Sequence, residues 1–520
     1  MTDYSPASGL TENMSAILEA LVARAQDPTT LAIIISIATI ALLTRFTSGK
    51  AETESNGGRI AFSPGYWLPY LGHVPQMAWD TDGFLSKMRD RSPTGAFSLN
   101  LMGSRHTFVH QPSMVTALMN KPHSVADEEW IADGLMFSNF GFIAPKGMDW
   151  KAGFRELHGL YKHLLSGPSL NGMVEQTIKN IQYHIGDWVT FNSYMSDQME
   201  WERQANAEVV ETPSGERFVK ADLMELIKNF ISKTANPTLF GTDLDKNFED
   251  IAQCIWDFDA AFVALAMGLP GWVPWPRLQK AQAARRRMIS YMSEYHEAWE
   301  KQLAGEDPGL RWQDLDSASP FIKERIQAFR SHKWPIQARA STDFALTWAM
   351  NGNANPLTFW IIYEIFRDPV LLEQIREEIA PYVKAVQPKN DFHLGVWIGP
   401  KLEKVDIDGL ITKCPLLKSA YVETLRMYTG VWSIKWLKES TNIKGKGDNG
   451  YMLQKGDYAH APHEVHQLDP RYFPDPDEWH ATRHIREEVD EKGNMVRTAD
   501  LGTIRPFGEF SFWSSKLQMS

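Results

Sequence analysis

Residues 344–368 read FALTWAMNGNANPLTFWIIYEIFRD, and this stretch decides the fold. It is long enough for about seven helical turns and mostly apolar, which predicts a long core helix. Its middle contains the turn-prone residues Asn351, Gly352 and Asn353, followed by Pro356. Gly and Pro in a helix interior cost roughly 1 and 3 kcal/mol relative to Ala. Two interpretations stay open: a helix ending at Asn351 with a new one starting at Pro356, or one long helix that opens a polar groove toward a ligand.

The chain around this stretch is predicted to be mainly helical. Short β-like pieces occur at Ala96–Leu101 and His106–His110, ahead of segments in which apolar residues recur near every 3.6 positions. The fold class is therefore mainly α with minor β. The helices predicted by this periodicity, besides the central one, are Asp149–Ser166, Gly172–Asn192, Val219–Thr234, Glu249–Gly268, Pro276–Gln302, Pro320–Ser331, Pro369–Val383 and Leu416–Thr429.

The composition is that of a globular protein with a large core. The 520 residues are 43% hydrophobic and 22% charged. A formal net charge of -11 argues against a nucleic-acid partner, because such binding rests on basic patches. The 19 Trp and 26 Phe residues are mostly core, and some are expected to line an apolar pocket. Cys254 and Cys414 are the only cysteines, which excludes a disulfide scaffold and fits a reducing compartment.

An apolar run near the N-terminus predicts a membrane anchor. Residues 29–44 (TTLAIIISIATIALLT) form the one strongly apolar continuous run, so we expect a transmembrane segment at 29–45 behind a lumenal tail at 1–28. A signal peptide fits poorly, since the run starts late and lacks a convincing cleavage site. Arg45 and Lys50 follow the run, which places the body on the cytosolic side. Residues 46–80 are expected to form a polar linker and a Pro/Gly hinge.

A second informative stretch is the predicted helix Leu416–Thr429, which contains Glu423 and Arg426. Side chains three residues apart share a helix face and can pair. Apolar neighbours surround this pair, and a buried arginine needs carboxylate partners. Downstream, repeated Asp-Pro and Phe-Pro steps between residues 469 and 476 prevent a helix and predict an irregular meander. Arg483 at its end is expected to reach the Glu423–Arg426 pair.

The chain resembles a microsomal cytochrome P-450, a haem-thiolate monooxygenase, in the order and spacing of six features. These are the anchor, the hinge, the central helix, Glu-x-x-Arg, the meander and Pro506-Phe507-Gly508. The resemblance covers the chain from Leu31 to Gly508. The central helix is most similar to the branch of sterol 7α- and 12α-hydroxylases and prostacyclin synthase. The resemblance implies a haem monooxygenase domain over residues 81–520 in the endoplasmic reticulum membrane. It also implies an NADPH-cytochrome P-450 reductase as partner and a bulky apolar substrate.

The resemblance assigns the catalytic positions of the central helix. Most family members carry an acidic residue and a threonine there, which deliver protons during oxygen activation. Gly352 occupies the acidic position and Asn353 the threonine position, so proton delivery would depend on a groove water that Asn353 holds. The alternative is that Asn353 merely bonds a backbone carbonyl freed by Pro356.

The resemblance also assigns cofactor-binding residues. Glu423, Arg426 and Arg483 would form the triad that holds the meander behind the haem, although Ala481-Thr482-Arg483-His484 departs from the family's Pro-x-Arg-Phe. Trp150 and Arg155 are the candidates for the haem propionates, but they stand one residue too far apart. The alternatives for the propionates are His158, Lys162, His163 and Lys435.

Phe507 and Gly508 match the start of the family's haem-binding signature and are further candidate cofactor-binding residues, and the largest departure follows them. Counting from Phe507, Phe510 stands at the family's glycine position and Ser514 at that of the axial cysteine. A neutral hydroxyl cannot replace the thiolate that favours O–O cleavage. We therefore expect an incomplete haem-binding segment, through a frameshift, a misread intron or a genuine truncation, and doubtful haem binding.

Three functional hypotheses follow. The first is a membrane-anchored monooxygenase of a sterol, terpenoid or polycyclic secondary metabolite, which receives its electrons from NADPH only through the reductase. The second is an isomerase or dehydratase of the same fold, which needs no reductase and no proton-delivering pair. The third is a haem-free pseudoenzyme, because the axial cysteine is absent.

Overall fold

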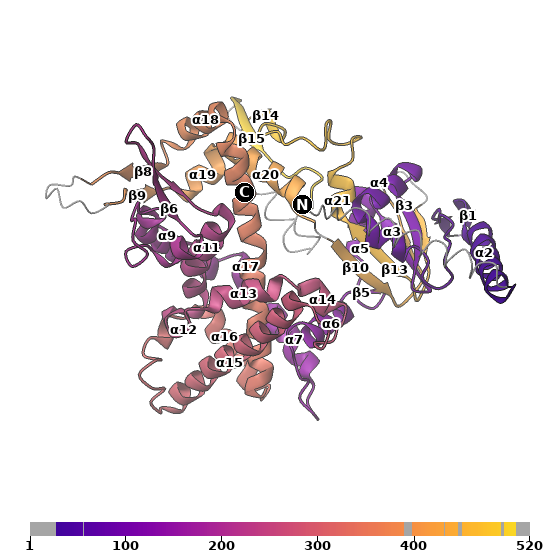
Figure 1. The fold of residues 1–520 in the computed structure, drawn as a ribbon, viewed down its shortest axis with the longest axis horizontal. Coiled ribbons are helices and arrows are strands. Elements are labelled where there is room, and N and C mark those ends of the chain that lie inside the picture. Colours follow the sequence, from indigo (N-terminus) through magenta and orange to yellow (C-terminus); the bar gives the residue numbers. More distant parts are fainter. Residues whose placement is uncertain are drawn as a thin grey trace, which may run out of the picture. The chain divides into compact units, whose positions relative to one another are not determined.

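The computed structural model describes residues 28–55, 57–388, 398–430, 432–445, 450–489 and 493–505. By its contacts the chain, drawn in Figure 1, divides into two compact units. Unit 1 comprises Met1–Glu128 and Trp432–Tyr472, and unit 2 comprises Glu129–Val431 and Phe473–Ser520. Most of the predicted lumenal tail, residues 1–27, lies outside the described residues.

Unit 1 is built on two small sheets. The larger has the strand order β3-β4-β13-β10-β5, in which β4 and β13 run parallel and the other neighbours antiparallel. Its strands are β3 (Ala96–Leu101), β4 (Ser104–Val109), β13 (Tyr458–Pro462), β10 (Trp432–Leu437) and β5 (Ala126–Asp127). The smaller sheet consists of β1 (Thr53–Ser55), β2 (Gly58–Ile60), β12 (Tyr451–Leu453) and β11 (Thr441–Ile443). The short helices of the unit are α3 (Val74–Trp79), α4 (Thr81–Arg91), α5 (Pro112–Met119) and α21 (His463–Gln467).

Helix α2 (Pro28–Ser48) precedes these sheets. It is, within the described part of the chain, the one helix long and apolar enough to cross a membrane. The C-terminal end of α2 is joined by hydrogen bonds to the segment that follows β2. Lys50 and Ser63 exchange backbone hydrogen bonds of 2.8 and 2.9 Å, and the Tyr66 amide donates to Ser48 Oγ at 2.9 Å. The predicted linker and hinge at 46–80 therefore contains β1, β2 and α3 and is joined to α2 by hydrogen bonds.

A pair of imidazoles bridges the central strands of the larger sheet. Trp432 Nε1 donates to His460 Nδ1 at 2.9 Å, so neutral His460 carries its proton on Nε2 and donates it to His106 Nδ1 at 2.7 Å. His460 also stacks on Phe108 with 4.6 Å between ring centroids. Burial lowers the pKa of His460 to about 3 and that of His106 to about 4. Both rings are therefore neutral in the folded protein at neutral pH.

We predict that unit 1 loses stability as the pH falls from 6.5 toward 4. Over this window His106 and His460 become protonated in the unfolded chain, where their pKa is about 6.5, but stay neutral in the folded protein. Acid therefore favours the unfolded state. The check is the urea midpoint of the Trp fluorescence transition at pH 7.5, 5.5 and 4.5. His460→Gln keeps an acceptor for Trp432 and should flatten the dependence, whereas His123→Gln at an exposed position should not. Equal slopes in both variants would contradict this account.

Unit 2 is mainly helical, and Figure 1 shows α17 (Ile336–Phe366) running through it with α13, α15, α11 and α20 along its length. Its other helices are α6 (Glu129–Ser138), α7 (Trp150–Leu160), α8 (Lys162–Leu165), α9 (Pro168–His184), α10 (Glu200–Gln204), α11 (Leu223–Phe240), α12 (Thr242–Asn247), α13 (Ile251–Asp259), α14 (Phe262–Ala266), α15 (Pro276–Ala304), α16 (Pro320–Ser331), α18 (Pro369–Ile379), α19 (Ile407–Lys413) and α20 (Pro415–Tyr428). Three hairpins complete the unit: β6 (Glu208–Glu211) with β7 (Arg217–Lys220), β8 (Val383–Val386) with β9 (Lys401–Val405), and β14 (Ile485–Val489) with β15 (Met495–Ala499).

The mainly α class is confirmed, and several predicted helix bounds are corrected. The helix predicted from Val219 begins at Leu223, because Val219 lies in β7 and the Asp222 side chain caps α11 by accepting from the Glu225 amide at 3.0 Å. The helix predicted to end at Val383 ends at Ile379, and Val383 opens β8. The segment predicted as one helix over Glu249–Gly268 forms α13 and α14. Apolar periodicity alone did not distinguish these strands and breaks.

A buried charged cluster joins three helices of the unit 2 core. Asp343 of α17 accepts from Arg325 Nε of α16 at 2.9 Å, and His296 Nε2 of α15 lies 3.0 Å from its other oxygen. All three side chains are fully buried. Burial would raise the pKa of Asp343, but Arg325 and His296 outweigh burial and hold this pKa below its usual 3.8. The core of unit 2 thus contains an ion pair that is completely shielded from water.

Candidate functional site

The central helix is continuous through Pro356, so the predicted break between Asn351 and Pro356 is wrong, whereas the polar groove of the other interpretation stays a prediction. Helix α17 includes every residue from Ile336 to Phe366. Its polar side chains bond the carbonyl one turn earlier: Thr347 to Asp343, Asn351 to Thr347, Asn353 to Ala349, Asn355 to Asn351 and Thr358 to Ala354. Such bonds to the carbonyl four residues earlier often bend a helix. The asparagines therefore satisfy backbone carbonyls in the turns that precede Pro356.

Two faces of α17 differ in character around Pro356. On the face toward α11, Asn351 is buried; its Oδ1 accepts from Ser232 Oγ at 2.7 Å and its Nδ2 donates to Asn236 Oδ1 at 2.9 Å. On the other face Asn353 is exposed, beside the partly buried Gly352. The Asn353 amide donates to the Ala349 carbonyl at 3.3 Å, which leaves its Oδ1 on the open face. The two residues predicted as the oxygen groove are thus half-buried (Gly352) and exposed (Asn353).

An aromatic wall flanks this face one turn earlier. The Trp348 ring stacks on Phe262 with centroids 4.2 Å apart, and Phe140 lies 5.6 Å from Trp348. A Cβ on Gly352 would lie 3.6 Å from the Trp348 ring, so the ring is adjacent to Gly352. Flat, apolar molecules are well recognised by such surfaces.

Glu423 of α20 is the centre of a charged cluster that holds the meander. Both of its oxygens accept from Arg426, from Nε and Nη2 at 2.8 Å each. Arg483 Nε donates to Oε1 at 2.9 Å, so the structure brings the predicted triad together. His484 Nε2 lies 2.9 Å from Oε2, and this fourth member was not predicted. The histidine stands where the family's pattern has phenylalanine, and that departure was the signal for it.

The same arginines bind the irregular backbone of the meander. Arg426 donates to the carbonyls of Pro476 at 2.7 Å and Glu478 at 3.2 Å. Arg483 donates to the carbonyls of Pro474, Asp475 and Glu478. Because these prolines exclude regular hydrogen bonding, the guanidinium groups replace it. The cluster therefore fixes the meander's conformation.

The electrostatics of Glu423 follow from these contacts. Burial opposes ionisation, but the hydrogen bonds from Arg426, His484 and Arg483 outweigh it and hold the pKa of Glu423 well below its usual 4.5. The carboxylate is 0% exposed, so its charge is compensated by these partners rather than by water. The contribution of Glu423 to stability is present above pH 4.5 and is lost only in stronger acid.

The predicted propionate partners are not brought together. Trp150 packs in an aromatic group with Phe137, Phe142 and Phe154, whereas Arg155 is exposed and lies 3.7 Å from Asp149. Of the alternatives, His163 lies 3.5 Å from Glu324, and His158 contacts Phe154 and Tyr161. Lys162 opens α8, and Lys435 of unit 1 is buried, 3.2 Å from Glu128. These positions leave the propionate assignment a prediction.

The two cysteines do not fit the role of an axial haem ligand. Cys254 is buried in α13, where burial raises the pKa of its thiol to about 12, and its Sγ lies 3.5 Å from Asp250. Cys414 is also buried, burial raises its pKa, and its Sγ donates to the Glu378 carbonyl. Both are therefore protonated thiols within packed structure. The candidate cofactor-binding residues Phe507 and Gly508, and Ser514 at the expected position of the axial cysteine, lie outside the described residues.

Comparison with known proteins identifies the class of this mainly helical chain with its Glu-x-x-Arg cluster. The cytochrome P450 family model matches residues 63–498, and the chain belongs to the cytochrome P450 family. It is 22% identical over 397 residues to "Cytochrome P450 monooxygenase nodJ" of Hypoxylon pulicicidum, covering 76% of this chain and 67% of that protein. It is 20% identical over 440 residues to the human "7-alpha-hydroxycholest-4-en-3-one 12-alpha-hydroxylase", covering 83% and 76%.

A third relative is a "Cytochrome P450 monooxygenase" of Gibberella zeae, 24% identical over 284 residues, which cover 54% of this chain and 48% of that protein. The chain thus aligns with about half the length of that relative. The predicted family is confirmed, and its distant relatives include a sterol hydroxylase and fungal monooxygenases.

Proposed function

We propose that this chain is the body of a monooxygenase that oxidises a bulky apolar small molecule, such as a sterol, terpenoid or polycyclic secondary metabolite. The observation that carries the proposal is the part of α17 where Gly352 lies against Trp348, which stacks on Phe262, and the next residue, Asn353, is exposed. The wall would bind the flat apolar substrate. The Asn353 side chain has no titrating group, so proton delivery would depend on a water molecule that its Oδ1 holds.

The proposal extends to location and partner. Helix α2 would anchor the protein in the endoplasmic reticulum membrane with the body facing the cytosol, because Arg45 and Lys50 follow it. The electrons would come from NADPH through NADPH-cytochrome P-450 reductase. Members of the family bind haem, which supplies the oxygen chemistry when bound. The buried, protonated thiols of Cys254 and Cys414 do not fit as its ligand.

The experiment compares the full chain with Ser514→Cys, each produced with haem supplied. Both are reduced, treated with carbon monoxide, and incubated with reductase, NADPH and a panel of sterols and terpenoids. We expect the thiolate-type band and oxygenated product only in Ser514→Cys, and only when reductase is present. Product that persists without reductase would indicate the isomerase or dehydratase instead. Absence of product and of substrate binding in both proteins would overturn the proposal.

A second candidate is a haem-free protein that binds the same apolar ligands without oxidising them. The buried, protonated state of both Cys254 and Cys414, together with Ser514 at the expected axial position, favours it. Purified full chain would then contain no stoichiometric haem and yet quench Trp fluorescence when a sterol or terpenoid is added. Stoichiometric haem in the purified chain would exclude this candidate.

A further inference from the structure

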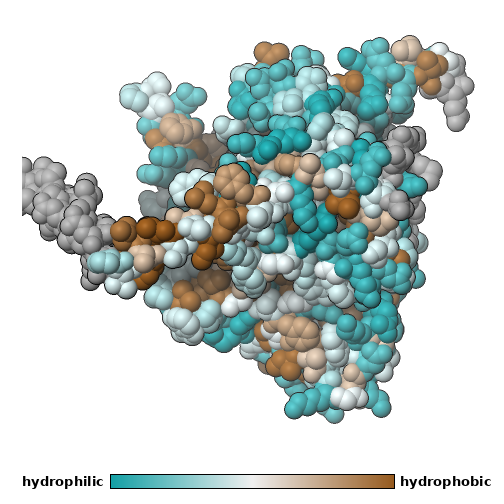
Figure 2. Space-filling view, turned by 90° about the vertical axis from the view of Figure 1, so that its right-hand side faces the viewer, coloured by the Kyte–Doolittle hydropathy of each residue, from teal (hydrophilic) through white to brown (hydrophobic). Residues whose placement is uncertain are grey.

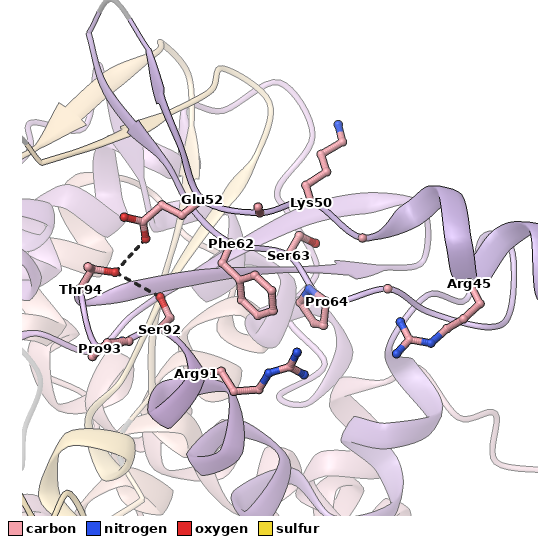
Figure 3. A pocket seen from close by; sticks show the side chains of 13 residues that line it. Arg45, Lys50, Glu52, Phe62, Ser63, Pro64, Arg91, Ser92, Pro93 and Thr94 are labelled. Carbon is pink, nitrogen blue, oxygen red and sulfur yellow. Dashed lines mark hydrogen bonds between the residues drawn. The ribbon is translucent and has the colours of Figure 1, made fainter.

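A cavity of about 450 Å³ lies in unit 1 where α2 meets the sheets (Figure 3). Three of its lining residues are cations: Arg45 in the last turn of α2, Lys50 just after it, and Arg91 at the end of α4. Figure 3 shows the guanidinium groups of Arg45 and Arg91 pointing toward one another below Phe62 and Pro64. The cavity thus gathers positive charge from three separate places in the chain.

These cations lack acidic partners among the residues that the structure describes. Arg45 lies over the Trp67 ring at 5.7 Å and Arg91 over the Phe62 ring at 5.1 Å, and the structure shows no ion pair for Arg45, Lys50 or Arg91. Surface arginines are usually compensated by nearby carboxylates or by solvent. Arg45 and Arg91 instead contact aromatic rings at one cavity, and their positive charges are available to bind an external anion.

The one carboxylate that lines the cavity is already engaged. Glu52 accepts from Thr94 Oγ1 at 2.8 Å and from the Tyr451 hydroxyl at 2.7 Å, and it lies 3.5 Å from Arg59. Figure 3 shows Glu52 on the side of the cavity opposite Arg45. Its charge is therefore directed toward Thr94 and away from the two guanidinium groups.

The position of the cavity indicates what anion it would meet. Helix α2 has 21 residues, about 31 Å, which matches the hydrocarbon thickness of a bilayer. Its C-terminal end, with Arg45, would then lie at the level of the lipid headgroups. The adjacent loop exposes Trp67 (48%) and Tyr70 (64%), side chains that favour this interface. Figure 2 looks onto the side on which α2 lies and shows apolar residues gathered on part of that surface.

We propose that this cavity binds the phosphate group of an anionic membrane phospholipid. Arg45 and Arg91 donate to the phosphate oxygens in the bidentate manner that suits guanidinium groups, and Lys50 adds a point charge at the rim. The apolar Phe62 and Pro64 contact the glycerol and the first acyl carbons. This inference rests on the proposed membrane anchoring of α2, and it is independent of haem and of turnover.

The test uses the purified full chain in neutral detergent. The probes are dioctanoyl phosphatidylserine, dioctanoyl phosphatidylcholine and inorganic phosphate, and thermal unfolding is followed as each is titrated. We expect phosphatidylserine to raise Tm, with a dissociation constant that is roughly 10- to 100-fold weaker in R45Q/K50Q/R91Q. The control K87Q/K121Q/K455Q removes the same charge from lysines that do not line the cavity and should bind like the unchanged chain. If the triple variant does not fold, the exposed single variant R91Q serves in its place.

Three results would overturn the proposal. Equal binding of phosphatidylserine by both triple variants would show that the cavity is not the site. An equal rise in Tm with phosphatidylcholine would show that the net charge of the lipid does not matter. An equal rise with inorganic phosphate alone would assign the site to free phosphate and not to a lipid. None of these results depends on whether the chain oxidises a substrate.

Discussion

Glu423→Ala is expected to destabilise unit 2 by about 3–5 kcal/mol, because it leaves Arg426 buried without its carboxylate. Arg483 and His484 lose the same partner, and the meander loses the groups that hold it. Since whole domains are stable by roughly 5–15 kcal/mol, this loss removes a large share of the stability of unit 2 and should lower its urea midpoint markedly. The measurement is the urea midpoint of the soluble fraction, followed by far-ultraviolet circular dichroism.

The chain contains a geometric control for this change. Glu373 and Arg376 on α18 have the same spacing and lie 2.6 Å apart, but both side chains are more than half exposed. Glu373→Ala should therefore cost less than about 1 kcal/mol. Similar midpoints for Glu423→Ala and Glu373→Ala would show that burial of the Glu423 cluster does not determine its contribution.

The second large effect is expected at Asp343, in the core between α15, α16 and α17. Asp343→Ala leaves the Arg325 guanidinium fully buried and uncompensated, at a cost of about 3–5 kcal/mol. The rings of Phe321 and Phe329, 5.5 and 5.4 Å from Arg325, recover only part of this. The measurement is the free energy of unfolding from urea denaturation.

A double substitution separates the charge from the volume at this site. Arg325→Met with Asp343→Leu removes both charges and keeps the space filled, so it should cost much less than Asp343→Ala alone. If the double variant is as unstable as the single one, packing or the remaining His296 is responsible, and the charge argument fails.

Local sequence patterns predicted the helices and side-chain pairs that depend on residues close together in the chain. The Glu423–Arg426 pair lies within one helical turn, and the length and apolarity of 344–368 predicted α17 despite Pro356. The continuity of α17 could not be predicted with certainty, because it depends on asparagine side chains that bond backbone carbonyls and on the contact of Asn351 with Asn236 of α11.

Apart from Arg483, which the resemblance placed at the Glu423–Arg426 pair, groups that meet from distant parts of the chain were not predicted. Asp343, Arg325 and His296 come from three helices, and nothing in the spacing of the sequence indicates that they share a buried site. The same holds for Arg45 and Arg91, which only the folding of unit 1 places around one cavity. His484 was visible only as a departure from the family pattern, and its contact with Glu423 required the structure.

The hydrogen bonds that join Lys50 to Ser63 and Tyr66 to Ser48 have a mechanical consequence. A membrane helix on a loose tether could spin about its axis without turning the domain behind it. Under the proposed membrane anchoring, these hydrogen bonds would couple rotation and tilt of α2 in the bilayer to the segment that follows it, so the sheets of unit 1 would turn with the helix.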